Sequence, residues 1–197
     1  MTSEDVMVVA TSDLGPFIAH RPANLIREGT AEILQLIAEK HFFIAREIAE
    51  ASPQYRQIIP YVVIRSGEQT YVLTRTTRQS ETRLHNKVSV GIGGHINPGH
   101  DLLSGLQKEL EEEVDVRSEY DLEFVGILND ESTEVGRVHL GAVYELRART
   151  AHVEIREVEK MSGRWMSDEE LAAARENMES WSQIVYDQFL IGESGNA

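Results

Sequence analysis

The chain has 197 residues, 41% hydrophobic and 26% charged, a composition typical of a soluble globular protein with one main domain. Its formal net charge of -14 disfavours nucleic acid and anionic membranes as partners, because phosphate groups are bound by basic surfaces. The chain has no cysteine, which excludes disulfides, thiolate nucleophiles and cysteine-ligated zinc. An acidic start and the lack of a long apolar run predict neither an export signal nor a membrane span, so we expect a cytoplasmic protein.

Residues 1–60 are expected to form an N-terminal extension of strand and helix. Residues 6–10 have the pattern of a short strand, and Gly15-Pro16 predicts a loop that leads to a second extended piece near Phe17. Apolar spacing then predicts one long helix from Thr30, a candidate N-cap, to about Ala51. This helix is apolar over a wide surface. It either packs on its own sheet or forms the interface of a homodimer, and we expect the homodimer.

A hairpin and a basic connection follow. Residues 61–76 predict two strands that turn at residues 66–69. The polar connection that comes next contains Arg75, Arg78, Arg83 and His85, a local run of cations in an acidic chain. It is either a solvated loop or a clamp for phosphate groups, and Arg75 and Arg78 are the candidate substrate-binding residues.

The strongest signal is the stretch GGHINPGHDLLSGLQKELEEEVDV, which begins at Gly93. A candidate strand at residues 88–92 precedes it, and the Pro98-Gly99 turn leads into a helix predicted over residues 101–114. One face of this helix should be buried, because its apolar side chains recur at steps of three and four. These apolar residues are Leu103, Leu106, Leu110 and Val114.

Three carboxylates share another face of the same helix. Glu109, Glu112 and Glu113 are separated by steps of three and four, so at about 100° per residue they project within an arc of roughly 100°. Like charges at this spacing repel one another, and a divalent cation would reverse that repulsion. Carboxylate oxygens on a rigid helix suit Mg²⁺ or Mn²⁺. The alternative is an ordinary solvated helix face without chemistry.

These residues resemble the signature of the Nudix (MutT-like) hydrolase family, G-x5-E-x7-R-E-U-x-E-E-x-G-U with U apolar. Gly94 takes the first glycine, and Glu109, Glu112 and Glu113 take the last three glutamates. Three positions depart from the pattern. They are His100 in place of a glutamate, Lys108 in place of arginine and Asp115 in place of glycine. By resemblance, the three glutamates are the metal ligands, Glu112 and Glu113 are catalytic, and Gly94, His100 and Lys108 support them.

The same resemblance implies the fold, an α/β/α sandwich with a mixed sheet over residues 61–197. Further strands are predicted at residues 124–128 and 138–146. Residues 154–171 resemble the acidic loop, short strand and helix that close many Nudix domains, where a loop glutamate can act as general base. The candidates for that base are Glu154, Glu157 and Glu159, of which we select Glu157.

The C-terminal part of the chain and two of its histidines have local structural signals. Ser167 and Glu170 predict a capping box, and a last amphipathic helix should bury Ile184, Val185 and Phe189 beside Trp181. His95 directly follows the glycine pair and is either a substrate-binding residue or part of a structural turn. His139 lies in an apolar run and is expected to be a hydrogen-bonded core residue.

Two functions are consistent with these residues. By resemblance, the chain is a Mg²⁺-dependent hydrolase that cleaves a phosphoanhydride in a nucleoside diphosphate linked to another group, or a related phosphoester. It is similar to a subgroup described as phosphoesterases. The alternative, suggested by the three departures, is a catalytically silent Nudix-fold module that binds a nucleotide or diphosphate metabolite.

Overall fold

A computed structural model of the protein describes residues 4–75, 87–156, 158–159 and 161–191. The chain forms two compact units. The first comprises Met1–Tyr61, Gly93–Leu106 and Val125–Val143, and the second comprises Val62–Ile92, Gln107–Phe124 and Tyr144–Ala197. The first unit therefore contains the predicted N-terminal extension together with two segments from farther along the chain.

Several elements contribute residues to both units. Strands β4 (Tyr55–Ser66), β10 (His139–Ala148) and β9 (Tyr120–Asp130) are neighbours in that order. Helix α4 (Leu102–Glu113) begins in the first unit and ends in the second. These bounds confirm the predicted strands at residues 124–128 and 138–146 and the predicted helix at residues 101–114.

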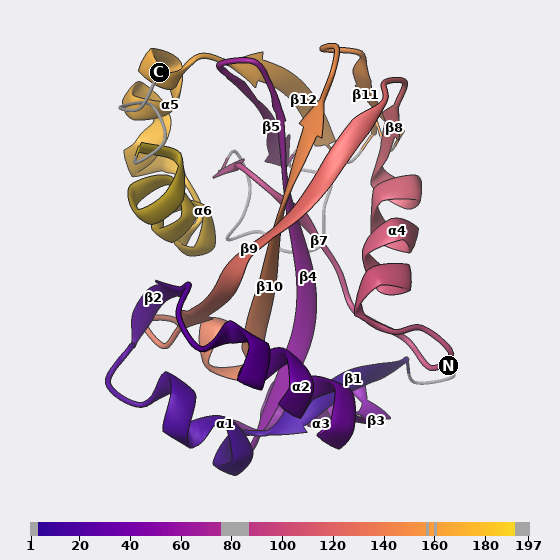
Figure 1. Ribbon diagram of the computed structural model, residues 1–197, viewed down its shortest axis with the longest axis vertical. Coiled ribbons are helices and arrows are strands. Elements are labelled where there is room, and N and C mark those ends of the chain that lie inside the picture. The colour runs from indigo at the N-terminus through magenta and orange to yellow at the C-terminus, as the bar shows by residue number, and fades with distance from the viewer. Residues whose placement is uncertain (1–3, 76–86, 157, 160, 192–197) are drawn as a thin grey trace. The chain divides into compact units, whose positions relative to one another are not determined.

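The first unit is built around short antiparallel pairings. Strand β1 pairs with β3 and with β4, while β2 pairs with the end of β9. Figure 1 shows α1, α2 and α3 beside β1 and β3. The elements are β1 (Asp5–Ala10), α1 (Thr11–Ile18), β2 (Ala23–Ile26), α2 (Thr30–Lys40), β3 (Phe42–Ala45), α3 (Arg46–Ala51) and the 3-10 turn η2 (Gly136–Val138). The two-residue strand β7 (Ile92–Gly93) lies at the unit boundary.

Two predictions in the extension are wrong. The Gly15-Pro16 segment lies inside α1, because Leu14 and Ile18, one helical turn apart, are both buried and their packing outweighs the turn signal. The long helix is broken after Lys40. Residues 42–45 instead pair with β1, where Ile44 packs against the buried Val6 and Val8.

Helix α2 also begins differently from the prediction. Its N-cap is Gly29, with a φ of 69°, and Thr30 is the first helical residue. A positive φ favours glycine at this position over residues with a Cβ atom.

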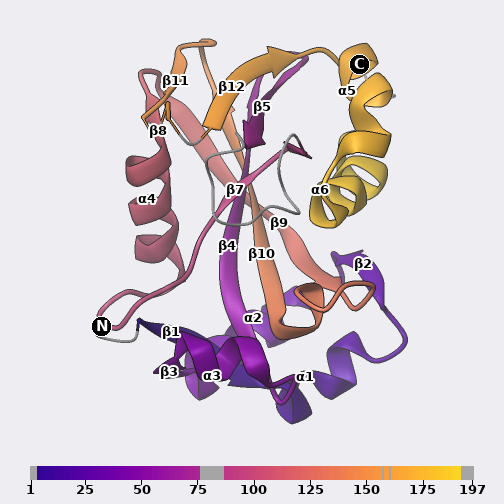
Figure 2. The same ribbon diagram turned by 180° about the vertical axis from the view of Figure 1, so that it is seen from behind.

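The second unit carries the hairpin and the C-terminal helices. Its elements are β5 (Gln69–Arg75), β6 (Val88–Ser89), β8 (Val114–Val116), β11 (Val153–Ile155), β12 (Met161–Met166), α5 (Asp168–Ala174), η3 (Arg175–Asn177), α6 (Ser180–Val185) and the π-helical turn η4 (Tyr186–Leu190). Strand β5 pairs antiparallel with β4, β6 and β12, and β8 pairs with β11. Figure 2 shows α5 and α6 side by side.

Most predictions for this part of the chain are confirmed. The hairpin turns at Gly67 and Glu68, and Ser167 and Glu170 form the predicted capping box. The last helical stretch buries Ile184, Val185 and Phe189, with Trp181 half-buried. The expected strand at residues 88–92 is present as two short pieces, β6 and the start of β7. In the part of the chain described, no helix is long and apolar enough to cross a membrane.

Candidate active site

Helix α4 begins with a reciprocal pair of hydrogen bonds between Asp101 and Ser104. The backbone N–H of Ser104 donates to Asp101 Oδ1 at 2.8 Å, and the backbone N–H of Asp101 lies 2.9 Å from Ser104 Oγ. These bonds from Ser104 lower the pKa of the Asp101 carboxyl. The Asp101 carboxylate therefore caps the helix and satisfies donors that would otherwise lack a partner.

The apolar face of α4 fixes the rotation of the helix. Leu106, Leu110 and Val114 are buried as predicted. Leu103 has the same helical phase but is 53% exposed, because the described part of the chain leaves the first turn of this stripe uncovered. Its predicted burial is wrong. Gly105 lies against Ile96, where an added Cβ would come within 2.9 Å of Ile96 Cγ1.

Two of the three predicted ligands surround the ammonium group of Lys108. Its Nζ lies 3.3 Å from Glu109 Oε1 and 3.5 Å from Glu112 Oε2. Burial opposes the charged form of Lys108, but the attraction of Glu109 and Glu112 outweighs it and raises the lysine pKa. The Glu109 side chain is 13% exposed and the Glu112 side chain 58% exposed. Glu111, also on α4, is exposed and belongs to another face.

The donor chemistry of this face fits a hard divalent cation only in part. Glu109 and Glu112 already converge on one positive centre, and carboxylate oxygens are the ligands that Mg²⁺ and Mn²⁺ prefer. Glu113 is half-buried at the end of the helix, and its carbonyl accepts a 2.9 Å hydrogen bond from the backbone of Arg156. Among the residues described, no three histidine, aspartate or glutamate side chains are arranged to hold a metal ion.

The departure at Asp115 has a local structural explanation. Asp115 lies in β8, opposite Glu154 of β11, and its carboxylate accepts hydrogen bonds from Arg117 and Arg156. His20 is the one residue other than glycine with a positive φ in the described part of the chain, so Asp115 has an ordinary backbone conformation. The position therefore does not require glycine here.

The loop before α4 carries Gly94, His95 and His100. His95 lies near Arg46 of α3, and its ring centroid is 5.7 Å from that of His139. Burial, followed by the positive charges of Arg46 and His139, lowers the pKa of His95 to about 4, so its imidazole is neutral at pH 7. The backbone N–H of His100 donates to Asn97 across the Pro98-Gly99 turn. Gly94 is half-buried.

The prediction for His139 is confirmed in its hydrogen bond. His139 Nδ1 lies 2.7 Å from the carbonyl oxygen of Val135, which can only accept, so Nδ1 carries the proton. The side chain is half-buried at the start of β10.

Some candidate residues lie outside the described residues. Arg78 and Glu157 are among them, as are Arg83 and His85. Arg75 ends β5. The other two candidate bases are exposed, and Glu154 forms an ion pair of 3.2 Å with Arg117.

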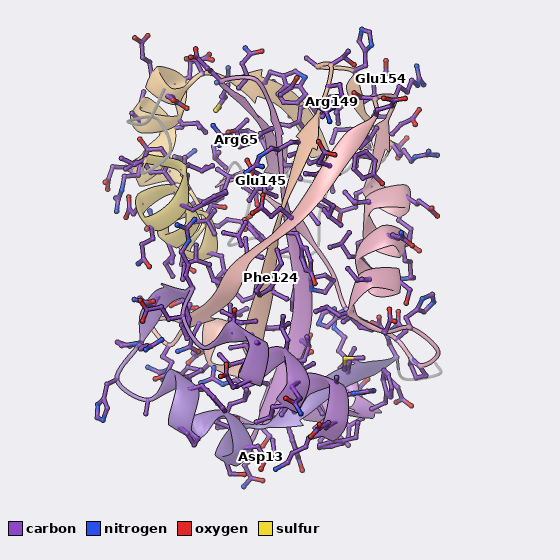
Figure 3. The ribbon with its side chains drawn as sticks, viewed as in Figure 1. Asp13, Arg65, Phe124, Glu145, Arg149 and Glu154 are labelled. Atoms are coloured by element: carbon purple, nitrogen blue, oxygen red, sulfur yellow. The ribbon has the colours of Figure 1, made fainter. Side chains whose placement is uncertain are left out.

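The second unit contains a buried ionic group that was not predicted from the sequence. Glu145 is 1% exposed, and its carboxylate oxygens lie 3.3 Å from Arg65 Nη1 and 2.6 Å from Arg147 Nη2. Figure 3 shows Arg65 and Glu145 close together. Arg147 also pairs with Glu123 on β9. The signal was present, because Glu145 and Arg147 alternate with apolar residues along one strand, but such a pattern normally marks a solvated face.

Comparison with known proteins identifies the family. The model of the NUDIX domain family matches residues 55–189. Protein YmaB of Bacillus subtilis (strain 168) is 36% identical over 169 residues, which cover 80% of this chain and 82% of YmaB. The crystal structure of Tm1382, provisionally named a Nudix hydrolase, has 32% identity and a TM-score of 0.80 over 95% of this chain and 99% of that one. DR0079 from Deinococcus radiodurans shares the fold, with 19% identity and a TM-score of 0.54 over 84% of this chain and 94% of its own.

The chain belongs to the Nudix family. The predicted mixed α/β fold of Nudix type is thereby confirmed. Membership supports a hydrolase of the pyrophosphohydrolase type that acts on a phosphorylated small molecule, and Nudix hydrolases generally use divalent metals.

Proposed function

We propose that the protein is a Mg²⁺- or Mn²⁺-dependent hydrolase that cleaves a phosphoanhydride bond in a nucleoside diphosphate linked to another group. The observation that carries this proposal is the convergence of Glu109 and Glu112 on a single positive centre at α4. Two carboxylates that already share one cation form an electrostatic site suited to a second, more highly charged ion.

Glu109, Glu112 and Glu113 are the residues proposed to hold the ion. A bound divalent cation would neutralise the phosphate oxygens and lower the pKa of a water molecule. Glu109, half-buried in the helix, fixes one side of the site, and the exposed Glu112 leaves room for substrate. Lys108 lies within reach of both carboxylates and positions them, while its ammonium group can swing toward a phosphate when the cation takes its place.

A carboxylate that is not a ligand must accept the proton from the attacking water. Glu157 remains our candidate for this general base. Glu154 is a weaker one in the described arrangement, because its carboxylate is already engaged in an ion pair of 3.2 Å with Arg117. Arg75, Arg78 and His95 remain the candidates for contact with substrate.

The test measures hydrolysis of a panel of substrates by the wild type and by two matched variants of α4. Dinucleotides, nucleotide sugars and nucleoside triphosphates are incubated with Mg²⁺ or Mn²⁺, and the released phosphate species are measured. Glu112→Gln should lower turnover by about a hundredfold or more, equivalent to about 3 kcal/mol of transition-state stabilisation. Glu111→Gln is the control, since it removes the same charge from another face and should keep turnover within about twofold. Equal losses in both variants would refute the site.

A silent binding module is the second candidate, and Lys108 is the observation that favours it. Its ammonium group already neutralises Glu109 and Glu112, as a permanent substitute for a cation would. The double variant His100→Glu with Lys108→Arg distinguishes the two functions. If it gains hydrolysis that the wild type lacks, the protein is a binding module. If the wild type hydrolyses a substrate and the double variant does not exceed it, the enzyme is supported.

We also propose that the chain forms a homodimer and is located in the cytoplasm. We further propose that residues 1–60 form an extension and residues 61–197 the catalytic domain. The dimer is supported by apolar side chains on the extension, where Phe42 is 38% and Ile48 56% exposed. Light scattering at micromolar concentration should give twice the chain mass of 22.2 kDa. A monomer mass would contradict the dimer.

A further inference from the structure

The loop that precedes α4 is bound to the first residues of the chain. Asn97 Nδ2 donates one hydrogen bond of 3.0 Å to Glu4 Oε1 and another of 3.0 Å to the carbonyl oxygen of Asp5. The backbone N–H of Met7 donates to the carbonyl of Ile96 at 2.8 Å. Both amide hydrogens of Asn97 therefore hold residues that lie more than 90 positions earlier in the chain. Figure 2 shows the start of β1 beside this loop.

Glu4 is itself held from a second side by α3. Arg46 Nη1 lies 3.1 Å from Glu4 Oε2, and the backbone N–H of Arg46 donates to the carbonyl of Glu4 at 2.7 Å. Partial burial acts to raise the pKa of Glu4, but the hydrogen bonds from Asn97 and Arg46 outweigh it and lower that pKa. Glu4 is therefore ionised at neutral pH, and its bond to Asn97 is a charge-assisted one.

The loop packs against the start of α4. Ile96 is fully buried, and Gly105 on the first turns of α4 lies against it with no room for a side chain. Gly93, at the other end of the loop, packs against the carbonyl oxygen of Pro60. Because Ile96 directly precedes Asn97 and packs on Gly105, a shift of Asn97 would act on the start of the helix through this contact. The same continuous helix carries Glu109, Glu112 and Glu113.

We propose that Asn97 is a positioning residue for the metal site and that Glu4, fixed by Arg46, orients it. This proposal rests on the proposed function, because it assigns the N-terminal residues a role in fixing the start of α4, the helix that carries the proposed ligands. Outer-shell partners of metal ligands commonly contribute a factor of about ten or more to metal affinity. We expect an effect of about tenfold here, at the lower end of that range, because Asn97 acts through α4 and touches no ligand.

The experiment measures Mn²⁺ binding from the paramagnetic resonance signal of the unbound ion, using the full chain. Asn97→Ala and Glu4→Gln should each raise the Mn²⁺ dissociation constant, by about tenfold for Asn97→Ala. Both should also speed hydrogen exchange at the backbone amides of Ile96 and Gly105 in the absence of metal. Glu50→Gln is the matched control. It removes a carboxylate of the same charge that lies 2.7 Å from Arg46 Nε on α3 itself, so the hydrogen bonds from Asn97 to Glu4 and Asp5 stay in place and both readouts should remain within about twofold.

A swap of donor and acceptor keeps the test valid if a single variant loses stability. Asn97→Asp alone places two carboxylates together and should weaken Mn²⁺ binding further. Adding Glu4→Gln supplies a new donor to that aspartate and should restore part of the affinity. A purely structural role would lower the melting temperature without this reversal in the Mn²⁺ dissociation constant.

The outcomes separate this proposal from the proposed function. If Mn²⁺ binding depends on Glu112 but is unchanged in Asn97→Ala, Asn97 is not a positioning residue while the metal site stands. If Glu50→Gln weakens binding as much as Glu4→Gln, the effect is general charge loss and the proposal is wrong. If no Mn²⁺ binding depends on Glu112, the proposed function fails and the positioning role fails with it.

Discussion

The neutral state of His95 predicts a specific loss of stability in acid. Its imidazole is surrounded by Arg46 and Glu50 on α3, by His139 on β10 and by Glu4 before β1. Burial dominates and, together with Arg46 and His139, lowers the pKa from 6.5 to about 4 despite the two carboxylates. At pH 6 the His95 side chain is therefore largely protonated in the unfolded chain and neutral in the folded protein.

The sign and size of the effect follow from proton linkage. Because the unfolded state binds more protons between pH 6.5 and pH 4, the free energy of unfolding falls as the pH is lowered through that interval. With these two pKa values the loss from His95 is about 2 kcal/mol at pH 5 and about 3 kcal/mol at pH 4. Below pH 4 both states are protonated and the loss is complete.

The assay compares urea unfolding of the wild type with that of His95→Gln at several pH values. Carboxylates far from His95 titrate alike in both proteins, so their contributions cancel in the difference between the two curves. That difference should shift by about 3 kcal/mol in favour of the variant between pH 7 and pH 4. A constant difference across this range would refute the reasoning, as would a proton resonance of His95 that titrates near pH 6.5 in the folded protein.

Three further substitutions, the first with a matched control, test separate parts of the structure. Gly136→Ala places a Cβ against the carbonyl oxygen of Asp130 and 3.0 Å from its Cγ, so in urea unfolding it should lower the free energy of unfolding by about 3 kcal/mol. Gly15→Ala in α1 is the control, because its Cβ would meet no atom within 4 Å and the free energy of unfolding should not fall. Ser167→Ala removes the capping box of α5 and should cost about 1 kcal/mol in the same measurement. Lys108→Arg restores a planar donor beside Glu109 and Glu112, so turnover should hold or rise, and a tenfold fall would contradict the positioning role of Lys108.

The sequence alone was sufficient for features that depend on neighbours along the chain. The periodicity of Leu106, Leu110 and Val114 predicted the buried face of α4, and the spacing of Ser167 and Glu170 predicted the cap of α5. The glutamate spacing on α4 led to the Nudix family, which the comparisons confirm. In each case the interacting groups are within four residues of one another, so local geometry fixes their relation.

Tertiary structure decided what depends on partners far away in the chain. Residues 42–45 have helical spacing, yet they form a strand because β1 supplies hydrogen bonds and the buried Val6 and Val8. The burial of Glu145 required Arg65, 80 positions away, as its partner, since a buried charge is stable only when it is paired. The bond from Asn97 to Glu4 spans 93 positions. No local pattern records such pairings, because their free energy comes from contacts that exist only after the chain has folded.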